Sequence, residues 1–234
     1  MQRYFATLVD QQIVLSEDDI HHIIHVMRMK VGDHFEVVVK ARLYECEITS
    51  LSPLQFNKIE KEEDVEIKTN ITLFFALAKG DKIDLVIQKA TELGVHKIVL
   101  FKSKRCVVNF DNKDIDKKLN RYRKIAKEAS EQCHRLIVPE ILGVIDLKNI
   151  DSYLEEVNLL AYEKLAGNTT ESFEIKERTK SVSIMIGSEG GFEEEEVNYL
   201  TSKGFQTISL GKRILRCETA AIYALSVLAY LLEK

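Results

Sequence analysis

The run from Ile71 to Ala78 is almost entirely apolar and marks the point where the sequence becomes regular. A continuous apolar run of this length is typical of a parallel strand that is buried on both faces. A helical pattern follows from Asp81 to Leu93, Gly94 is placed to end it, and another strand-like run covers His96 to Phe101. Strands that alternate with helices in this way predict an α/β domain with a mostly parallel sheet.

The alternation continues toward the C-terminus. An amphipathic helix is expected from Lys113 to Arg135, and further strands are expected at Asn158–Tyr162, Ser181–Ile186 and Thr207–Leu210. The last apolar run, Thr219–Leu232, predicts a buried or interface helix. It is shorter than the roughly 18 residues that a membrane helix requires, so no membrane span is expected.

The segment before Ile71 follows a different pattern. Ser16 is an expected N-cap for a short helix, and short strands are expected at Phe35–Val39, Tyr44–Ile48 and Gln55–Ile59. Short strands at this spacing predict a small barrel or sandwich. We therefore predict two domains, residues 1–69 and residues 70–234.

Composition excludes several classes of protein. Hydrophobic residues make up 45% of the chain, enough for a substantial core, and no secretory signal opens it. The four cysteines are scattered without the paired spacing of a zinc site, and the histidines at 21, 22 and 25 lack other ligands at metal-binding spacing. We expect a cytoplasmic protein with reduced thiols and without a bound metal.

Charge is distributed unevenly along the chain. The net charge of -4 argues against a general nucleic-acid coat, but residues 97–135 hold 12 Lys and Arg against 5 Asp and Glu. Residues 140–203 hold 14 acidic residues against 6 basic ones. The basic segment can face a polyanion such as RNA, and a lysine-rich helix face exposed to solvent is the alternative.

The segment Ile186–Phe192 is a glycine-rich loop between an expected strand and an expected helix. Ligands of open α/β sheets bind beyond the carboxyl ends of strands, so this position suits a binding site. The loop has neither the spacing of a dinucleotide fingerprint nor that of a P-loop, and the acidic run Glu193–Glu196 would repel a phosphate. A nucleoside-like cofactor without phosphates remains compatible, and a tight turn without a ligand is the alternative.

A second unusual loop, Ser209–Ala221, joins a strand to the last helix. Its apolar side chains are unexpected in a connecting loop and predict either an apolar pocket for a flat ring or burial by an unusual topology. Arg216 and Glu218 flank the start of the helix with opposite charges, where a simple salt bridge is the alternative to a functional pair.

Together, the segments Gly187–Phe192 and Leu210–Ala220 resemble the SPOUT methyltransferases, and within them the RsmE family of 16S ribosomal RNA uridine methyltransferases. The resemblance covers nearly the whole chain, because further motifs follow the family in order: His25–Arg28 with Gly32 and Asp33, Lys79–Lys82, Gln88–Val95, Ser103–Cys106 and Ala129–Arg135 with Pro139. This chain departs from the family at three places. Ser188 stands where many members carry Pro, Met27 stands where many carry Leu, and Lys40–Arg42 replaces an Asp-Gly turn.

The resemblance implies a small N-terminal PUA-like β-barrel and a C-terminal SPOUT α/β domain with a trefoil knot. It implies an enzyme that methylates N3 of a uridine in 16S ribosomal RNA, with S-adenosylmethionine bound in the knot. The expected RNA partner is the small ribosomal subunit, and the enzyme is expected to act as a homodimer. A knot would also explain apolar loop residues, because a threaded chain buries loops.

The resemblance also assigns residues to roles. Arg216 is the candidate to stabilise a developing uracil anion, and Glu189 or Glu218 are candidate proton acceptors or positioning groups. Basic residues expected at RNA phosphates, with packing or solvation as the alternative, are Arg28, Lys30, Arg105, Arg121 and Arg135. The S-adenosylmethionine pocket is expected to be lined by Gly187, Ser188, Glu189, Gly190, Gly191, Leu210, Gly211, Ile214, Leu215, Cys217, Thr219 and Ala220.

Three other functions are compared with this one. A SPOUT enzyme could act on another RNA such as transfer RNA, but the barrel domain and the segment Glu131–Arg135 favour the ribosomal substrate. A catalytically silent RNA-binding protein would be expected to show decay in the two loops, which look intact. A nucleotide-binding α/β enzyme is disfavoured because neither phosphate-loop pattern is present.

Overall fold

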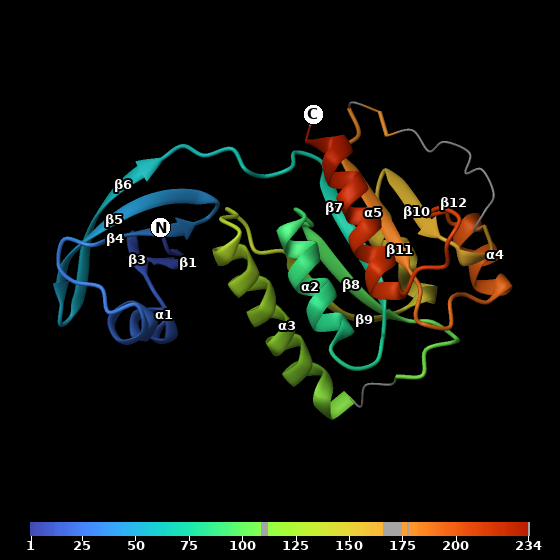
Figure 1. Ribbon diagram of the computed structural model, residues 1–234, viewed down its shortest axis with the longest axis horizontal. Helices are drawn as coiled ribbons and strands as arrows, with labels where there is room; N and C mark the ends of the chain where they lie inside the picture. The colour runs from blue at the N-terminus through green and yellow to red at the C-terminus, as the bar shows by residue number, and fades with distance from the viewer. Residues whose placement is uncertain (109–111, 166–174, 177, 234) are drawn as a thin grey trace. The chain divides into compact units, whose positions relative to one another are not determined.

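The structure is a computed structural model of the chain, and it describes residues 1–108, 112–165, 175–176 and 178–233 (Figure 1). By its contacts the chain divides into two compact units, residues 1–66 with 127–138 and residues 67–126 with 139–234. The domain boundary predicted between residues 69 and 70 remains a prediction. No helix among the described residues is both long enough and apolar enough to cross a membrane.

The first unit is built on a four-stranded sheet in the order β1-β4-β5-β6, beside a separate hairpin. β1 runs parallel to β4, and the remaining pairs are antiparallel. The sheet strands are β1 (Arg3–Phe5), β4 (His34–Val39), β5 (Arg42–Leu51) and β6 (Leu54–Lys61), and the hairpin strands are β2 (Thr7–Val9) and β3 (Gln12–Val14). The three strands predicted in this region are confirmed.

Ser16 caps α1 (Glu17–His21), because its hydroxyl accepts a hydrogen bond from the Asp19 backbone N–H at 3.1 Å. The predicted N-cap is therefore confirmed, and the chain continues into a short π-helix, η1 (His22–Val26). Asp19 is buried, and both of its carboxylate oxygens accept from Lys127 Nζ at 2.8 Å. This ion pair joins α1 to the residues 127–138 of the same unit.

Two buried arginines complete the first unit. Arg3 is 1% exposed and donates to Glu36 at 2.9 Å and to the backbone carbonyl of His134 at 2.6 Å. Arg135 is 4% exposed and donates to Glu66 at 2.7 Å. Each buried guanidinium is matched by a carboxylate, so neither charge is left unpaired inside the unit.

The second unit is built on a six-stranded sheet in the order β12-β10-β11-β7-β8-β9, and every pairing in it is parallel. The strands are β7 (Asn70–Ala76), β8 (Lys97–Lys102), β9 (Glu140–Asp146), β10 (Val157–Ala161), β11 (Ser181–Ile186) and β12 (Phe205–Ile208). The predicted parallel sheet is confirmed, although β9 was not among the predicted strands. Central strands such as β7 are buried almost throughout, as their continuous apolar sequence indicates.

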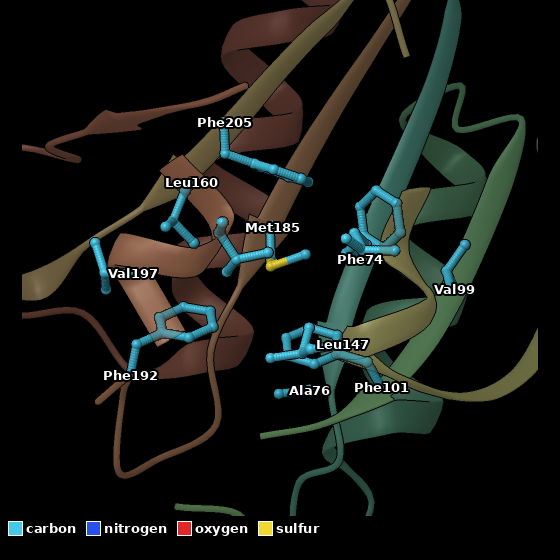
Figure 2. Close-up of a cluster of buried hydrophobic side chains, with 12 residues drawn as sticks. Phe74, Ala76, Val99, Phe101, Leu147, Leu160, Met185, Phe192, Val197 and Phe205 are labelled. Carbon is cyan, nitrogen blue, oxygen red and sulfur yellow. The ribbon is translucent and has the colours of Figure 1, made fainter. Parts of the chain in front are cut away.

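Helices cover both faces of this sheet (Figure 1). α2 and α5 pack against each other, and α5 lies on β11. On the opposite face, side chains from α4 and from the 3₁₀-helix η2 join a buried cluster with Phe74, Met185 and Phe205 (Figure 2). The helices are α2 (Lys82–Glu92), α3 (Asn112–Gln132), α4 (Glu194–Ser202) and α5 (Cys217–Leu232), with the 3₁₀-helices η2 (Leu147–Tyr153) and η3 (Glu163–Leu165).

The parallel arrangement determines where a site can form. Because β7, β11, β10 and β12 are adjacent and parallel, the segments that follow them emerge at one edge of the sheet. Ligands of open α/β sheets bind at this edge. The two loops singled out in the sequence follow β11 and β12, so the fold brings both to this edge.

The turn between β4 and β5 forms without an Asp-Gly pair. Val39 pairs with Arg42, and the two turn residues Lys40 and Ala41 have φ angles of 50° and 59°. Both residues therefore lie in the left-handed region, which costs a residue with a Cβ about 1 kcal/mol. Burial of Val37, Val38 and Val39 before the turn stabilises the hairpin against this cost.

Replacing this turn by Lys40→Asn with Ala41→Gly should stabilise the protein by about 1 kcal/mol, because Asn-Gly adopts this turn with little strain. Urea unfolding followed by circular dichroism measures the change. Ala126→Gly, at a buried position of helix α3, is the control and should destabilise by more than about 1 kcal/mol, because loss of the packed methyl adds to the helix-propensity cost. A turn variant that is less stable than the original protein would show that these two positions do not adopt left-handed backbone.

Candidate active site

A cavity of about 420 Å³ opens at the carboxyl edge of the second unit's sheet. Its volume lies within the range of roughly 300–1,000 Å³ that is usual for small-molecule sites. Most of its wall is formed by the segments that follow β10, β11 and β12. The lining residues are Lys82, Ala161–Glu163, Ile186–Gly191, Ser209–Gly211, Arg213–Cys217 and Ala220.

The glycine-rich loop owes its shape to contacts within the protein. A Cβ on Gly187 would lie 2.9 Å from the ring of Phe192, and Phe192 stacks on Phe101 in the core with ring centroids 6.2 Å apart (Figure 2). Gly191 has a φ of +67°, and its N–H donates to the carbonyl of Ser188 at 2.9 Å. The tight turn alone is therefore enough to explain Gly187 and Gly191, and the two glycines do not by themselves indicate a ligand.

Arg105 supports the same loop from outside. It donates to the carbonyl of Gly190 at 3.0 Å and to the carboxylate of Glu193 at 2.8 Å. Glu193 is also the N-cap of α4, in a capping box with Glu196. One exposed guanidinium thus connects the glycine-rich loop to the start of α4.

Lys82 links three segments around the cavity. Its Nζ lies 2.9 Å from a carboxylate oxygen of Glu189 and 3.4 Å from one of Glu218. Glu189 also accepts from the backbone N–H of Lys79 at 3.1 Å. The first turn of α2, the glycine-rich loop and the first turn of α5 therefore share one ammonium group.

Lys82 contributes to a lowered pKa at both carboxylates. Burial tends to raise the pKa of Glu189, but hydrogen bonds from Lys82 and from backbone N–H groups outweigh it and lower the pKa. For Glu218, burial is likewise outweighed by a backbone N–H, the Cys217 thiol and Lys82, so the pKa of this carboxyl is also lowered. Both groups are anionic and weakly basic at neutral pH.

Cys217 contributes a thiol and not a thiolate to the cavity wall. Burial, followed by its hydrogen bond to Glu218, raises the pKa of Cys217 to about 12. A protonated thiol is a poor nucleophile. The chemistry of the cavity is therefore not that of a cysteine nucleophile.

Arg216 lies at the cavity as the N-cap residue of α5, and it is exposed. Within the described ranges, no residue forms a hydrogen bond or ion pair with its guanidinium. A simple salt bridge between Arg216 and Glu218, the alternative that the sequence left open, is therefore not formed, and Glu218 instead lies 3.4 Å from Lys82 Nζ. Arg216 keeps its donors available for a ligand.

Most of the residues expected to bind the cofactor lie together. All of them line the cavity except Thr219, which is exposed on α5. The apolar residues Leu210, Ile214 and Leu215 all line it, and Ile214 is 78% exposed. Glu218 does not line the cavity itself and contacts two residues that do, Lys82 and Cys217.

The residues expected at RNA phosphates lie in different places. Arg28 and Lys30 are exposed in the first unit after η1, and Arg121 is exposed on α3 with an ion pair to Asp84. Arg135 is buried, and its guanidinium forms an ion pair with Glu66. We therefore assign Arg135 a structural role in place of the predicted phosphate contact. The described part of the chain has no cluster of three His, Cys, Asp or Glu that could hold a metal ion.

Sequence reasoning did not select Lys82 or the end of β10, Ala161–Glu163, as parts of the site. Both follow a parallel strand, so the rule that ligands bind beyond carboxyl ends could have found them. Taken together, the cavity offers apolar side chains, loop backbone and the carboxylates of Glu163 and Glu189. These groups suit a ligand that joins a flat ring to a cationic group and carries no phosphate.

Comparison with known families matches two parts of the chain. Residues 65–229 match a family described as an RNA methyltransferase domain, and residues 15–60 match one described as an RNA methyltransferase PUA domain. Ribosomal RNA small subunit methyltransferase E of Bacillus subtilis is 37% identical, with 100% of this chain and 98% of that protein covered.

Solved structures show the same similarity over the full length. A putative methyltransferase of Legionella pneumophila in complex with S-adenosylmethionine is 30% identical, with a TM-score of 0.85 and coverage of 98% of this chain and 97% of that one. A ribosomal RNA small subunit methyltransferase E of Neisseria gonorrhoeae, bound to S-adenosylmethionine, is 28% identical, with a TM-score of 0.85 and coverage of 99% and 98%.

Lys82→Met should lower the free energy of unfolding by about 1 kcal/mol, because Glu189 and Glu218 lose their shared cation and repel each other. Adding Glu218→Gln should recover part of this loss, since it removes the repulsion. Urea titrations of the two single variants and the double variant measure the coupling. Lys89→Met, which removes an ion pair to Glu92 on the same helix, is the control and should cost only a few tenths of a kcal/mol. Equal losses for the variants at Lys82 and Lys89 would contradict the linking role.

Proposed function

This chain belongs to the RsmE family, the ribosomal RNA small subunit methyltransferases E, and we propose that it methylates N3 of a uridine in 16S ribosomal RNA with S-adenosylmethionine as the methyl donor. One observation carries the proposal above the others. The glycine-rich loop and the loop Ser209–Arg216 form one cavity at the carboxyl edge of the parallel sheet, in a chain that matches the family over its full length.

The residues of the cavity fit S-adenosylmethionine. Its flat adenine suits the apolar side chains of Leu210, Ile214 and Leu215, and its sulfonium and ammonium charges suit a wall that holds Glu163 and Glu189. The acidic start of α4, Glu193–Glu196, disfavours a phosphate-bearing cofactor. The cavity also suits the cofactor in size.

When bound, S-adenosylmethionine supplies a methyl group on its sulfonium for transfer in line to the uracil nitrogen. The protein's own groups align the uracil and compensate the charge that develops on it. N3 of uracil is protonated at neutral pH, so negative charge appears on the ring as the proton passes to solvent water. We assign Arg216 the role of donating to a uracil oxygen where this charge develops, because it lines the cavity and its guanidinium has no hydrogen-bond or ion-pair partner among the described residues.

Glu189 and Glu218 are assigned positioning roles in place of proton acceptance. Their pKa values are lowered, so each is a weak base toward the uracil nitrogen. Through Lys82 they hold the glycine-rich loop and the start of α5, which carries Arg216, in one arrangement. Holding two reactants in line contributes several kcal/mol in well-oriented reactions, on the order of 7–11 kcal/mol at most.

The RNA contacts proposed are Arg28 and Lys30 in the first unit and Arg105 and Arg121 in the second, all exposed. We further propose that the sheet and hairpin of the first unit form the PUA-like β-barrel, which matches the RNA methyltransferase PUA family over residues 15–60. Phosphate contacts of this kind weaken as salt rises, because binding releases counterions from the RNA.

We also propose the trefoil knot and the homodimer that the family implies. β12 lies at one edge of the sheet, and the helix that follows it, α5, packs on the central strand β11 and on α2. This return of the chain from the edge to the centre supports the proposed threading. One face of α5 carries two exposed aromatic side chains, Tyr223 and Tyr230, which are 49% and 68% exposed. We propose that this face contacts a second copy of the chain. The proposed setting is the cytoplasm, with 16S RNA in the assembled small subunit as substrate.

Incubation of the protein with tritiated S-adenosylmethionine and unmodified small ribosomal subunits should place label in 3-methyluridine. Naked 16S RNA and bulk transfer RNA serve as parallel substrates, and nucleoside chromatography identifies the product. Arg216→Lys should reduce the rate about 10²-fold or more, because one well-placed donor is worth roughly this much. Label in transfer RNA alone would contradict the proposal that 16S ribosomal RNA is the substrate. Cofactor binding without label in any RNA would contradict the proposal that a uridine in RNA accepts the methyl group.

A further inference from the structure

The loop that follows β12 carries three cations close together in the sequence. Lys212, Arg213 and Arg216 are all exposed, and two of them, Arg213 and Arg216, also line the cavity. Among the described residues, none forms a hydrogen bond or an ion pair with the charged groups of these three side chains. Arg216 already has a proposed role at the uracil, so Lys212 and Arg213 are two cations of this loop that the proposed function leaves unused.

Other cations beside the cavity are neutralised within the protein. Lys82, which lines the cavity, lies 2.9 Å from a carboxylate oxygen of Glu189. Arg105, which donates to the glycine-rich loop, lies 2.8 Å from a carboxylate oxygen of Glu193. These cations must give up a carboxylate before they can bind an outside anion, whereas Lys212 and Arg213 can bind one directly.

The two ends of the loop are held by hydrogen bonds, and its middle is open to solvent. At the start, the Ser209 hydroxyl accepts from the N–H of Gly211 at 3.3 Å. At the end, the carbonyl of Arg216 accepts from the N–H of Ala220 at 2.8 Å in the first turn of α5. Between them, Ile214 is 78% exposed. A large anion can therefore reach the cations of this loop without a change in the fold.

The cofactor cannot be the partner of all three cations. S-adenosylmethionine has a single carboxylate, and Lys212 does not line the cavity that we assign to the cofactor. An RNA strand carries a phosphate at every nucleotide, so it offers several anions in a row. Enzymes that modify a base take the nucleotide out of the stack and insert the base into a pocket. The backbone phosphates of that nucleotide then lie at the opening of the pocket.

We infer that Lys212 and Arg213 form a phosphate-binding site for the RNA strand at the opening of the cavity, where they hold the backbone on either side of the uridine that is methylated. This inference rests on the proposed function and adds two residues to its RNA contacts. With the backbone held at these two positions, the uracil is brought to the cavity where Arg216 lies.

Binding of naked 16S ribosomal RNA, measured by microscale thermophoresis at several KCl concentrations, tests the site. Lys212→Gln and Arg213→Gln should each weaken binding about threefold to tenfold, since each removes one exposed charged contact. Each should also reduce the slope of log affinity against log salt by roughly 0.7 to 0.9, the contribution of one phosphate. Arg213→Lys retains the charge, so its slope should match that of the original protein.

Lys203→Gln is the matched control. It changes the net charge by the same amount, but Lys203 is already paired with Asp151 at 2.7 Å, so its salt slope should stay that of the original protein. Equal salt slopes for Lys203→Gln, Lys212→Gln and Arg213→Gln would overturn the inference.

Isothermal titration calorimetry with S-adenosylhomocysteine separates an RNA contact from a cofactor contact. A loss of affinity for this compound in Arg213→Gln would assign Arg213 to the cofactor and overturn the inference. If the original protein binds S-adenosylhomocysteine and 16S RNA but transfers no methyl group to any RNA, the proposed function is overturned instead, and the salt slopes still decide whether Lys212 and Arg213 bind phosphate.

Discussion

The parallel pairing of β12, β10, β11 and β7 is the constraint on which the rest of the second unit depends. Four adjacent strands that run in one direction release four segments at one edge, although these segments lie far apart in the sequence. The cavity needs all four, because its wall includes Lys82 after β7, Glu163 after β10, the glycine-rich loop after β11 and Arg216 after β12. A change of direction in any one strand would remove one part of this wall.

Within this frame, short-range contacts give the loops their shape. Phe192 anchors the glycine-rich loop in the core, and Lys82 holds it to the start of α5 through Glu189 and Glu218. Lys82 and backbone N–H groups together lower the pKa values of both carboxylates, which makes them weak proton acceptors. Among the described residues, Arg216 has no acidic partner. The ion-pair cluster of Lys82, Glu189 and Glu218 thus both joins the loops of the fold and sets the charges near the cavity.

The sequence predicted much of this, and its failures have physical reasons. Long buried strands such as β7 and the cap at Ser16 were predicted because apolar runs and capping residues act locally. The strands β1 to β3 were missed because three residues are too few to show a pattern. Residue types could not distinguish Arg135, which is buried and paired with Glu66, from Arg216, which lines the cavity and has no partner in the described part of the chain. Only tertiary contacts separate a structural guanidinium from an available one.

The central claim is that the loops at the carboxyl edge of the sheet bind S-adenosylmethionine, and amide hydrogen exchange with and without the cofactor tests it most directly. Binding at this cavity should slow exchange in residues 187–193 and 209–220, because the ligand suppresses opening of the segments it contacts. Residues 34–61 of the first unit, which contain the β4–β5–β6 hairpins, should exchange at the same rate in both conditions. Protection confined to residues 34–61, or bound cofactor without protection of either loop, would contradict the account.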